Sequence, residues 1–137
     1  MPDATPEPPA LTGDIPSHWA ARTPDKPALI TPAGVLSYAE LHVRADRFAH
    51  ALASGGIDKG ARIAILCANG PEYVAVHFGA ARAGAALVHL SQRIHADELR
   101  RILAATTPRL VMADAAGAAL LEAAGGAPGI VGMGEVP

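Results

Sequence analysis

The stretch that decides the fold is RIAILCANGPEYVAVHFGAARAGAALVHL, residues 62–90. Its first part, residues 62–67, is apolar after the arginine, as expected of a parallel strand buried on both faces. Residues 71–83 begin with proline and are apolar on nearly every side, which predicts a helix packed between other elements. Gly84 ends that helix, and residues 85–90 predict a second buried strand. The stretch therefore predicts a strand–helix–strand unit.

The residues that follow continue the alternation of strand and helix. Residues 96–106 place leucine and isoleucine on one side and charged residues on the other, which predicts an amphipathic helix. Residues 110–113 predict a third strand, residues 114–124 an alanine-rich helix capped by its aspartate, and residues 130–131 a fourth strand. Strands that alternate with helices through short connections predict an α/β fold, a mostly parallel sheet with flanking helices.

The region before this unit contains one more strong helix signal. Ser37 and Glu40 have the spacing of a capping box, and apolar residues recur after them at three- and four-residue steps. Gly55 and Gly56 follow, and glycine readily takes the left-handed conformation that ends a helix. The pattern predicts a helix over residues 37–54.

Before this helix the sequence predicts a hairpin and a short helix. Two apolar runs, residues 28–31 and 35–38, flank a turn that has proline second and glycine fourth. Ser17 is expected to cap a short helix that ends at residues 23–24, because the threonine there precedes a proline. Residues 1–16 hold five prolines and no lysine or arginine, so we expect a flexible Pro-rich lead-in.

Length and composition limit the classes of protein. The 137 residues are the size of one domain, and half of them are apolar, enough for a sizeable core. A net charge of −2 without a basic run argues against a nucleic-acid partner, and 4% aromatic residues argue against a stacking platform for single strands. One cysteine excludes a disulfide framework and a Cys-rich zinc site. The sequence lacks the pattern of a signal peptide and the ~18 consecutive apolar residues of a membrane span, so we expect a cytoplasmic protein.

Two candidate binding features come from the residue types alone. The loop of residues 68–71 lies between a strand end and a helix start, where an anion could bind, although a simple helix start is the favoured interpretation. His42, Asp46 and His50 share one helical stripe and could hold a metal, although solvated polar residues are the favoured interpretation. No dinucleotide fingerprint follows a predicted strand, which argues against a stand-alone nucleotide-binding domain.

Three further residues carry side chains that can take part in chemistry. His89, at the end of a predicted strand, and His95, just before a predicted helix, are interpreted as hydrogen-bonded structural histidines. Cys67 ends a buried strand and is interpreted as a packed thiol, because a nucleophile would need exposure and a nearby base. The residues therefore assign no catalytic, cofactor-binding or metal site.

Four stretches in series resemble a known family. LSYAEL at residues 36–41 resembles the first core motif of adenylate-forming enzymes, the AMP-forming acyl- and aryl-CoA ligases, and ARAGAALV at residues 81–88 resembles the second. Residues 60–72 are similar to the segment between these motifs, and residues 96–103 to the helix that follows them. The resemblance covers residues 17–115, in order and with sensible spacing.

The resemblance implies the reaction of the parent enzyme. ATP and a carboxylic acid form an acyl-adenylate and pyrophosphate, and the CoA thiol then displaces AMP. ATP, Mg²⁺ and CoA are implied for the parent enzyme, with none of them bound to this segment. The family's phosphate loop, adenine and ribose motifs and catalytic lysine are expected after residue 137, so no catalytic residue is carried over.

We therefore expect the chain to be the opening portion of the large N-terminal domain of such a ligase. Residues 1–16 would be its lead-in, and residues 17–137 a truncated α/β subdomain that is inactive alone. The expected partner is the remainder of the ligase. The isolated segment is expected to self-associate, because its apolar strands and helix need cover. The alternative is a non-catalytic α/β interaction module derived from such a ligase.

The sequence departs from the family pattern at one place. His89 stands where proline is usual, and Ser91 and Gln92 stand where an Asn/Asp-Pro pair is common. Either an unusual local turn or membership of a divergent branch would account for these three residues.

Overall fold

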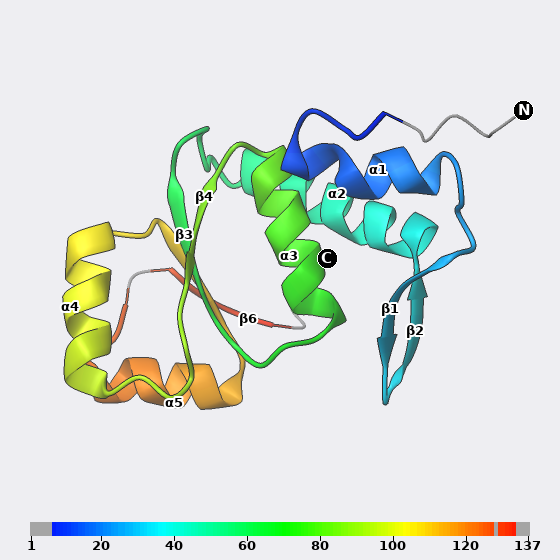
Figure 1. Cartoon of the computed structure of the whole chain (residues 1–137). Helices are drawn as coiled ribbons and strands as arrows, with labels where there is room; N and C mark the ends of the chain where they lie inside the picture. The colour runs from blue at the N-terminus through cyan, green and yellow to red at the C-terminus, as the bar shows by residue number, and fades with distance from the viewer. Residues whose placement is uncertain (1–6, 128, 134–137) are drawn as a thin grey trace, which may run out of the picture.

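The chain forms a four-stranded sheet, a two-stranded hairpin and helices on both sides of the sheet (Figure 1). A computed structural model describes residues 7–127 and 129–133. The elements in chain order are the 3-10 helix η1 (Thr12–Asp14), α1 (Ile15–Ala20), β1 (Pro27–Thr31), β2 (Gly34–Ser37), α2 (Tyr38–Ser54), β3 (Arg62–Leu66), α3 (Pro71–Arg82), β4 (Ala86–His89), α4 (Ala96–Thr106), β5 (Leu110–Ala113), α5 (Ala115–Ala123) and β6 (Ile130–Gly132). The predicted α/β class, a mostly parallel sheet with flanking helices, is confirmed. Within the described ranges, none of the helices has the length and apolar character to cross a membrane.

The four-stranded sheet has the order β4-β3-β5-β6, and every neighbouring pair is parallel. Of these four strands, β3 comes first in the sequence and lies in the interior of the sheet. The chain then adds β4 on one side of β3, and β5 and β6 on the other. Ile65 shows the register, because it pairs with His89 of β4 and with Met112 of β5. All four predicted strands of this unit are present, within one residue of their expected ends.

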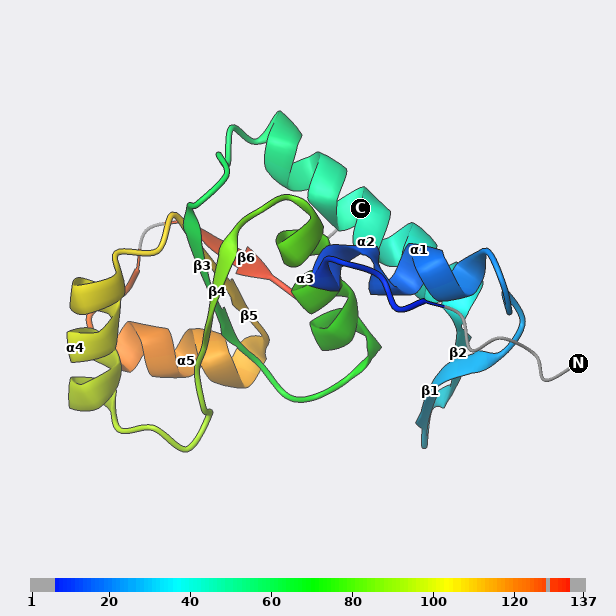
Figure 2. The ribbon, with the colours of Figure 1, turned by 45° about the horizontal axis from the view of Figure 1, so that its top comes forward.

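The two faces of the sheet carry separate core clusters. Alternate residues of a strand point to opposite faces. Ile63 and Ile65 pack with side chains of α2 and α3, whereas Ala64 and Leu66 pack with side chains of α4 and α5. Figures 1 and 2 show these two helix layers on opposite sides of the strands. The apolar sequence of β3 is therefore explained by cover on both faces.

β4 lies at the edge of the sheet, and here the structure corrects a prediction. The apolar run 85–90 predicts a strand buried on both faces, yet Ala86 and His89 are exposed and Leu87 and Val88 are only half-buried. The order of the strands is responsible, since among the described residues β4 has a strand neighbour on one side only. An apolar pattern thus predicts a strand without predicting its place in the sheet.

The hairpin and α2 form as the sequence predicts. The Ser37 hydroxyl accepts a hydrogen bond from the Glu40 backbone N–H (3.2 Å), and the Glu40 carboxylate accepts one from the Ser37 N–H (2.8 Å), which confirms the capping box. β1 and β2 are antiparallel, and Ile30 of one pairs with Val35 of the other. These two side chains are 78% and 59% exposed, so the hairpin carries an apolar pair on its open face.

The first α-helix begins earlier than its predicted cap. Asp14 rather than Ser17 precedes the helix, and α1 starts at Ile15. The Ser17 hydroxyl donates to the Asp14 carbonyl oxygen (2.9 Å) and so lies inside the first turn. The helix ends at Ala20, before the expected stop at residues 23–24. Pro16, in the first turn, is compatible with a helix start because its missing N–H has no partner there.

The lead-in is also shorter than predicted. Residues 12–16 are helical rather than a flexible segment, so the boundary at residue 16 is wrong. Gly13 is buried against the last turn of α3, where a Cβ would come within 2.6 Å of the Arg82 backbone nitrogen. This close approach fixes η1 to the rest of the fold. Residues 1–6 of the predicted lead-in lie outside the described residues.

Candidate functional site

The loops after β3 and β5 face each other at the carboxyl edge of the sheet. The chain leaves β3 toward α3 and β4 on one side, and leaves β5 toward α5 and β6 on the other, so the strand order reverses between them. Doubly wound α/β proteins bind their ligands in a crevice at such a reversal. A cavity of about 300 Å³ lies here, lined by Cys67, Ala68, Asn69, Gly70, Glu72, Tyr73, Asp114 and Met133.

One carboxylate joins the loops around the crevice. Asp114 accepts hydrogen bonds from the backbone N–H groups of Ala68 (2.9 Å) and Gly117 (2.8 Å) and from the Gln92 side-chain amide (2.7 Å). Burial raises the pKa of this carboxyl, but the hydrogen bonds outweigh burial and hold the pKa below its ordinary value of 3.8. Asp114 is therefore ionised near neutral pH. It caps α5, as predicted, and also fastens together the loops that follow β3, β4 and β5.

The N-terminus of α5 lies unusually close to β3. A Cβ on Gly117 would overlap the carbonyl oxygen of Leu66, so only glycine fits at this position. The close approach packs the first turn of α5 against the end of β3. The Gly117 N–H donates to Asp114 because Asp114 caps this turn. The packing of α5 against β3 thus depends on one residue without a side chain.

Three aromatic side chains stack between α3 and the end of β4. The Tyr73 hydroxyl lies 2.5 Å from His89 Nδ1, and the two ring centroids are 5.7 Å apart. The His77 ring, one turn further along α3, lies 5.4 Å from the His89 ring. Burial, and secondarily His89, lowers the pKa of His77, while burial, and secondarily Cys67, raises the pKa of Tyr73. The surroundings therefore favour the neutral forms of both side chains, and the hydrogen-bonded role predicted for His89 is confirmed.

Each of the three departures from the family pattern has its own contact. His89 bonds to the tyrosine of α3, and Gln92 donates to Asp114. The Ser91 hydroxyl accepts from the Arg93 backbone N–H (3.1 Å), which orders the turn between β4 and α4. The local turn is therefore held by side-chain hydrogen bonds where the family pattern has proline.

The backbone at position 89 is compatible with either residue. The N–H groups of Ala86 and Leu90 donate to the carbonyls of Ala61 and Ile65 on β3. In a parallel ladder alternate N–H groups face the same neighbour, so the N–H of residue 89 points away from β3. A proline there would cost no hydrogen bond to β3, and histidine at this position gains a side-chain contact.

The remaining candidate residues have plain environments. Cys67 is buried, and burial, with the nearby charges of Asp114 and Glu72, raises the pKa of its thiol to about 11. The thiol is protonated near neutral pH, in agreement with the interpretation as a packed cysteine. His95 precedes α4 and is exposed, but its side chain makes no capping hydrogen bond, so the hydrogen-bonded role expected for it does not appear at this cap.

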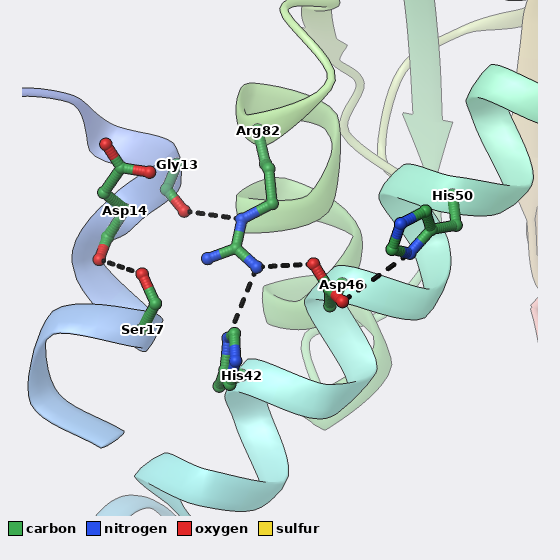
Figure 3. Close-up of polar contacts among 7 residues, drawn as sticks. All are labelled: Gly13, Asp14, Ser17, His42, Asp46, His50 and Arg82. Carbon is green, nitrogen blue, oxygen red and sulfur yellow. Dashed lines mark hydrogen bonds and ion pairs between the residues drawn. The ribbon is translucent and has the colours of Figure 1, made fainter. Parts of the chain in front are cut away.

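Arg82 enters the polar stripe of α2 (Figure 3). Its Nη1 donates to Asp46 Oδ1 (2.7 Å) and lies 3.3 Å from His42 Nδ1, and its Nε donates to the Gly13 carbonyl oxygen (3.3 Å). His50 Nδ1 lies 3.5 Å from Asp46 Oδ2. The hydrogen bond from Arg82 is the main cause that lowers the pKa of Asp46. One guanidinium thus joins α2, α3 and the segment before α1.

This arrangement favours a structural role for the stripe over a metal site. The guanidinium occupies the position between His42 and Asp46 and would repel a metal cation. Among the residues that the structure describes, no three possible metal ligands come together. Arg82 follows Asp46 by 36 residues, so a helical period within α2 could not have revealed it.

The loop of residues 68–71 forms the start of α3, as favoured from the sequence. Pro71 is the first residue of the helix and Gly70 the residue before it, and no side chain caps this end. The Glu72 carboxylate lies in the first turn and pairs with Arg44 (3.2 Å). The positive end of the helix dipole therefore already has a negative group beside it.

Comparison of the sequence with known proteins gives one consistent family. The AMP-binding enzyme family matches residues 16–133. A fatty acid–acyl-carrier-protein ligase of Streptomyces coeruleorubidus is 33% identical over 121 residues, which are 87% of this chain and 23% of that protein. A medium/long-chain-fatty-acid–CoA/3-oxocholest-4-en-26-oate–CoA ligase of Mycolicibacterium smegmatis is 36% identical over 87 residues, 64% of this chain and 16% of that protein.

Comparison with solved structures agrees. A Mycobacterium tuberculosis fatty acyl CoA synthetase superposes with a TM-score of 0.82 at 28% identity, over 89% of this chain and 26% of that one. VinN in complex with 3-methylaspartate superposes with a TM-score of 0.85 at 29% identity, over 93% of this chain and 35% of that one. The chain thus spans 16% and 23% of the two curated relatives and 26% and 35% of the two structures.

Proposed function

This chain belongs to the AMP-binding enzyme family, and we propose that it is the opening portion of the large N-terminal domain of an AMP-forming carboxylate ligase. In the proposed reaction ATP and a carboxylic acid form an acyl-adenylate and pyrophosphate, and a thiol such as that of CoA then displaces AMP. The observation that supports the proposal is the family match over residues 16–133, together with relatives named as acid–thiol ligases.

In this proposal the described residues build the framework beside the reaction. The acyl electrophile needs a good leaving group and charge stabilisation at the phosphates, which preorganised donors and cations supply. At the strand reversal Asp114 accepts two backbone N–H groups, and no lysine or arginine lines the cavity there. The described residues also contain no cluster of three possible metal ligands, and no step is assigned to Mg²⁺. We therefore propose that this segment alone is inactive.

Exchange of pyrophosphate into ATP tests the proposal. The complete reading frame that contains these 137 residues should catalyse exchange with at least one acid from a panel of short, long and aromatic carboxylic acids. Residues 1–137 alone should show no exchange above a blank. Exchange that rises with the amount of the isolated segment would overturn the proposal that this segment is inactive alone. A complete reading frame that carries the family's lysine and phosphate loop yet shows no exchange would overturn the ligase assignment.

The alternative, a non-catalytic α/β interaction module, makes the opposite prediction for the gene. Sequencing the gene beyond the codon for Pro137, and measuring the intact mass of the native protein, separates the two. A continuing frame with the missing motifs supports the ligase segment. A stop codon after Pro137 and a native mass of 13.9 kDa would support the module.

The remainder of the ligase is the proposed partner of this segment. Without it, the open edge of β4 and the exposed pair Ile30 and Val35 are left uncovered, and we expect the isolated segment to self-associate. Light scattering across a dilution series checks this expectation. A single 13.9 kDa species at every concentration, without binding of a dye for apolar surface, would contradict it.

A further inference from the structure

Tyr73, His77 and His89 attach the open edge of the sheet to α3. Tyr73 and His77 lie one turn apart on α3, and their ring centroids are 5.7 Å and 5.4 Å from that of His89. The Tyr73 hydroxyl lies within hydrogen-bond distance of His89 Nδ1, at 2.5 Å. In the part of the chain that the structure describes, β4 has one neighbouring strand, so this stack is a second attachment for its end.

We propose that Tyr73, His77 and His89 form a pH-responsive latch, which holds the end of β4 against α3 while both imidazoles are neutral and loosens when both are protonated. The Nδ1 atom of a neutral His89 can accept a hydrogen bond from the Tyr73 hydroxyl. Two imidazolium rings 5.4 Å apart repel each other, and the half-buried position of His77 makes its charge costly.

The charged groups nearest the latch have partners of their own. Directly after β3 the facing group is Cys67, which burial keeps as a neutral thiol. In the first turn of α3, Glu72 pairs with Arg44 of α2. On the loop after β5, Asp114 is held by its three hydrogen-bond donors. A second proton on the latch therefore meets no unpaired carboxylate among these neighbours.

The charged groups at the far ends of the same elements are also engaged. Arg62 begins β3 opposite Ala86 and donates to the Thr106 carbonyl and the Thr107 hydroxyl. Arg82 ends α3 and donates to Asp46 of α2. Both lie at the opposite end of their element from the latch.

The direction of the pH effect follows from His77. Burial first, and His89 second, lowers the pKa of His77 from its ordinary value of 6.5. The unfolded chain therefore binds a proton more readily than the folded chain does. The contribution of the latch to stability is complete above 6.5 and is lost as the pH falls through the lowered pKa of the folded state.

Loosening the latch also changes the cavity at the carboxyl edge of the sheet. Tyr73 lines that cavity, and its hydroxyl is the atom that His89 holds. When the latch opens, one wall of the cavity is free to move. The latch thus links the protonation of an edge histidine to the shape of the crevice, which goes beyond the proposed ligase activity and does not depend on it.

Amide hydrogen exchange on the 137-residue chain tests the latch. The Leu90 N–H donates to the Ile65 carbonyl (3.0 Å) and reports on the attachment of β4 to β3. Its protection factor should fall severalfold between about pH 7.5 and about pH 5.5, the range in which histidine titrates. In His77→Gln and in His89→Gln the same change of pH should alter the protection factor much less. His95→Gln, which removes an exposed histidine away from the latch, is the matched control and should behave as the wild type does.

Titration of the imidazole resonances gives an independent readout. The pKa of His77 should move up toward its ordinary value in His89→Gln and stay unchanged in His95→Gln. A wild type with no loss of Leu90 protection in acid would overturn the proposal. A loss in both latch variants as large as the loss in the wild type would also overturn it. A His77 pKa that is the same in the wild type and in His89→Gln would overturn the coupling. If His89→Gln failed to fold, the pH dependence of Leu90 protection in His77→Gln, compared with that in the wild type, would still test the latch.

Discussion

β4 and β5 lie on either side of β3, and they differ in exposure far more than in sequence. Both are four-residue apolar strands that follow a helix. Val88 of β4 and Val111 of β5 pair with the same residue, Ala64. Val111 is fully buried, whereas Val88 is half-buried. The comparison teaches that the place of a strand in the sheet decides how much an apolar side chain contributes to stability.

The largest effect is expected from truncating the centre of β5. Met112 is fully buried and pairs with Ile65 from the side opposite to His89. Met112→Ala should lower the free energy of unfolding by about 3 kcal/mol, because it removes apolar contacts and leaves a cavity. Urea unfolding monitored by circular dichroism measures the loss. A loss below about 1 kcal/mol would mean that the side chains around β5 fill the cavity, and that β5 tolerates truncation as well as the edge strand β4 does.

The matched valine pair tests the comparison most directly. Val111→Ala should lower the free energy of unfolding by about 2 kcal/mol, and Val88→Ala by less than about 1 kcal/mol. The same atoms are removed in both variants, but at position 111 they are fully buried and at position 88 only partly buried. The two variants serve as each other's control in the same urea experiment. Equal losses would show that β4 is as well covered as β5 and would break the comparison.

The capping box shows where exposure stops being a guide to cost. Ser37 is near the surface, yet its hydroxyl satisfies the Glu40 N–H at the start of α2. Ser37→Ala should lower stability by about 1 kcal/mol, and Glu40→Ala by less. If Ser37→Ala lowered the free energy of unfolding no more than Val88→Ala does, the capping hydrogen bond would contribute nothing beyond burial.

The smallest effect is expected at the ion pair of α2 and α3. The side chain of Asp46 is 41% exposed, so its pairing with Arg82 should contribute less than about 1 kcal/mol. The pKa of Asp46 is lowered from 3.8, so this contribution is present above 3.8 and is lost as the pH falls through the lowered pKa. Asp46→Asn should therefore be slightly less stable than the wild type near neutral pH. The difference should vanish in urea melts at strongly acidic pH, and a difference that persists there would have another cause.

Local signals in the sequence account for most of the elements. The capping box at Ser37, the proline that begins α3 and the aspartate that caps α5 each act within one turn, so a single sequence reveals them. The start of α1 was misplaced because Ser17 is a good cap type, while the structure uses it one turn inside the helix. The choice between these positions depends on how Gly13 packs on α3, which is a tertiary contact.

The contacts of the candidate site are not local. Tyr73 and His89 are 16 residues apart, and Gln92 and Asp114 are 22 apart. The first pair meets because α3 packs beside β4, and the second because β4 and β5 lie on either side of β3. No period in the sequence encodes either arrangement. The sequence predicted strands correctly and left their neighbours open, so it could not place β4 at an edge or bring three loops to Asp114.

The Asp114 carboxylate acts as a ligand that the chain carries with it. The N–H groups of Ala68 and Gly117 are donors of the kind that hold a bound phosphate at a strand reversal, and here they hold Asp114 instead. A tethered group competes at an effective concentration of about millimolar or more. Free phosphate or carboxylate that binds the two amides no more tightly than the aspartate does cannot displace it below that concentration. The two amides are therefore already occupied, and they would be released only to a ligand that binds them more strongly than their own aspartate does.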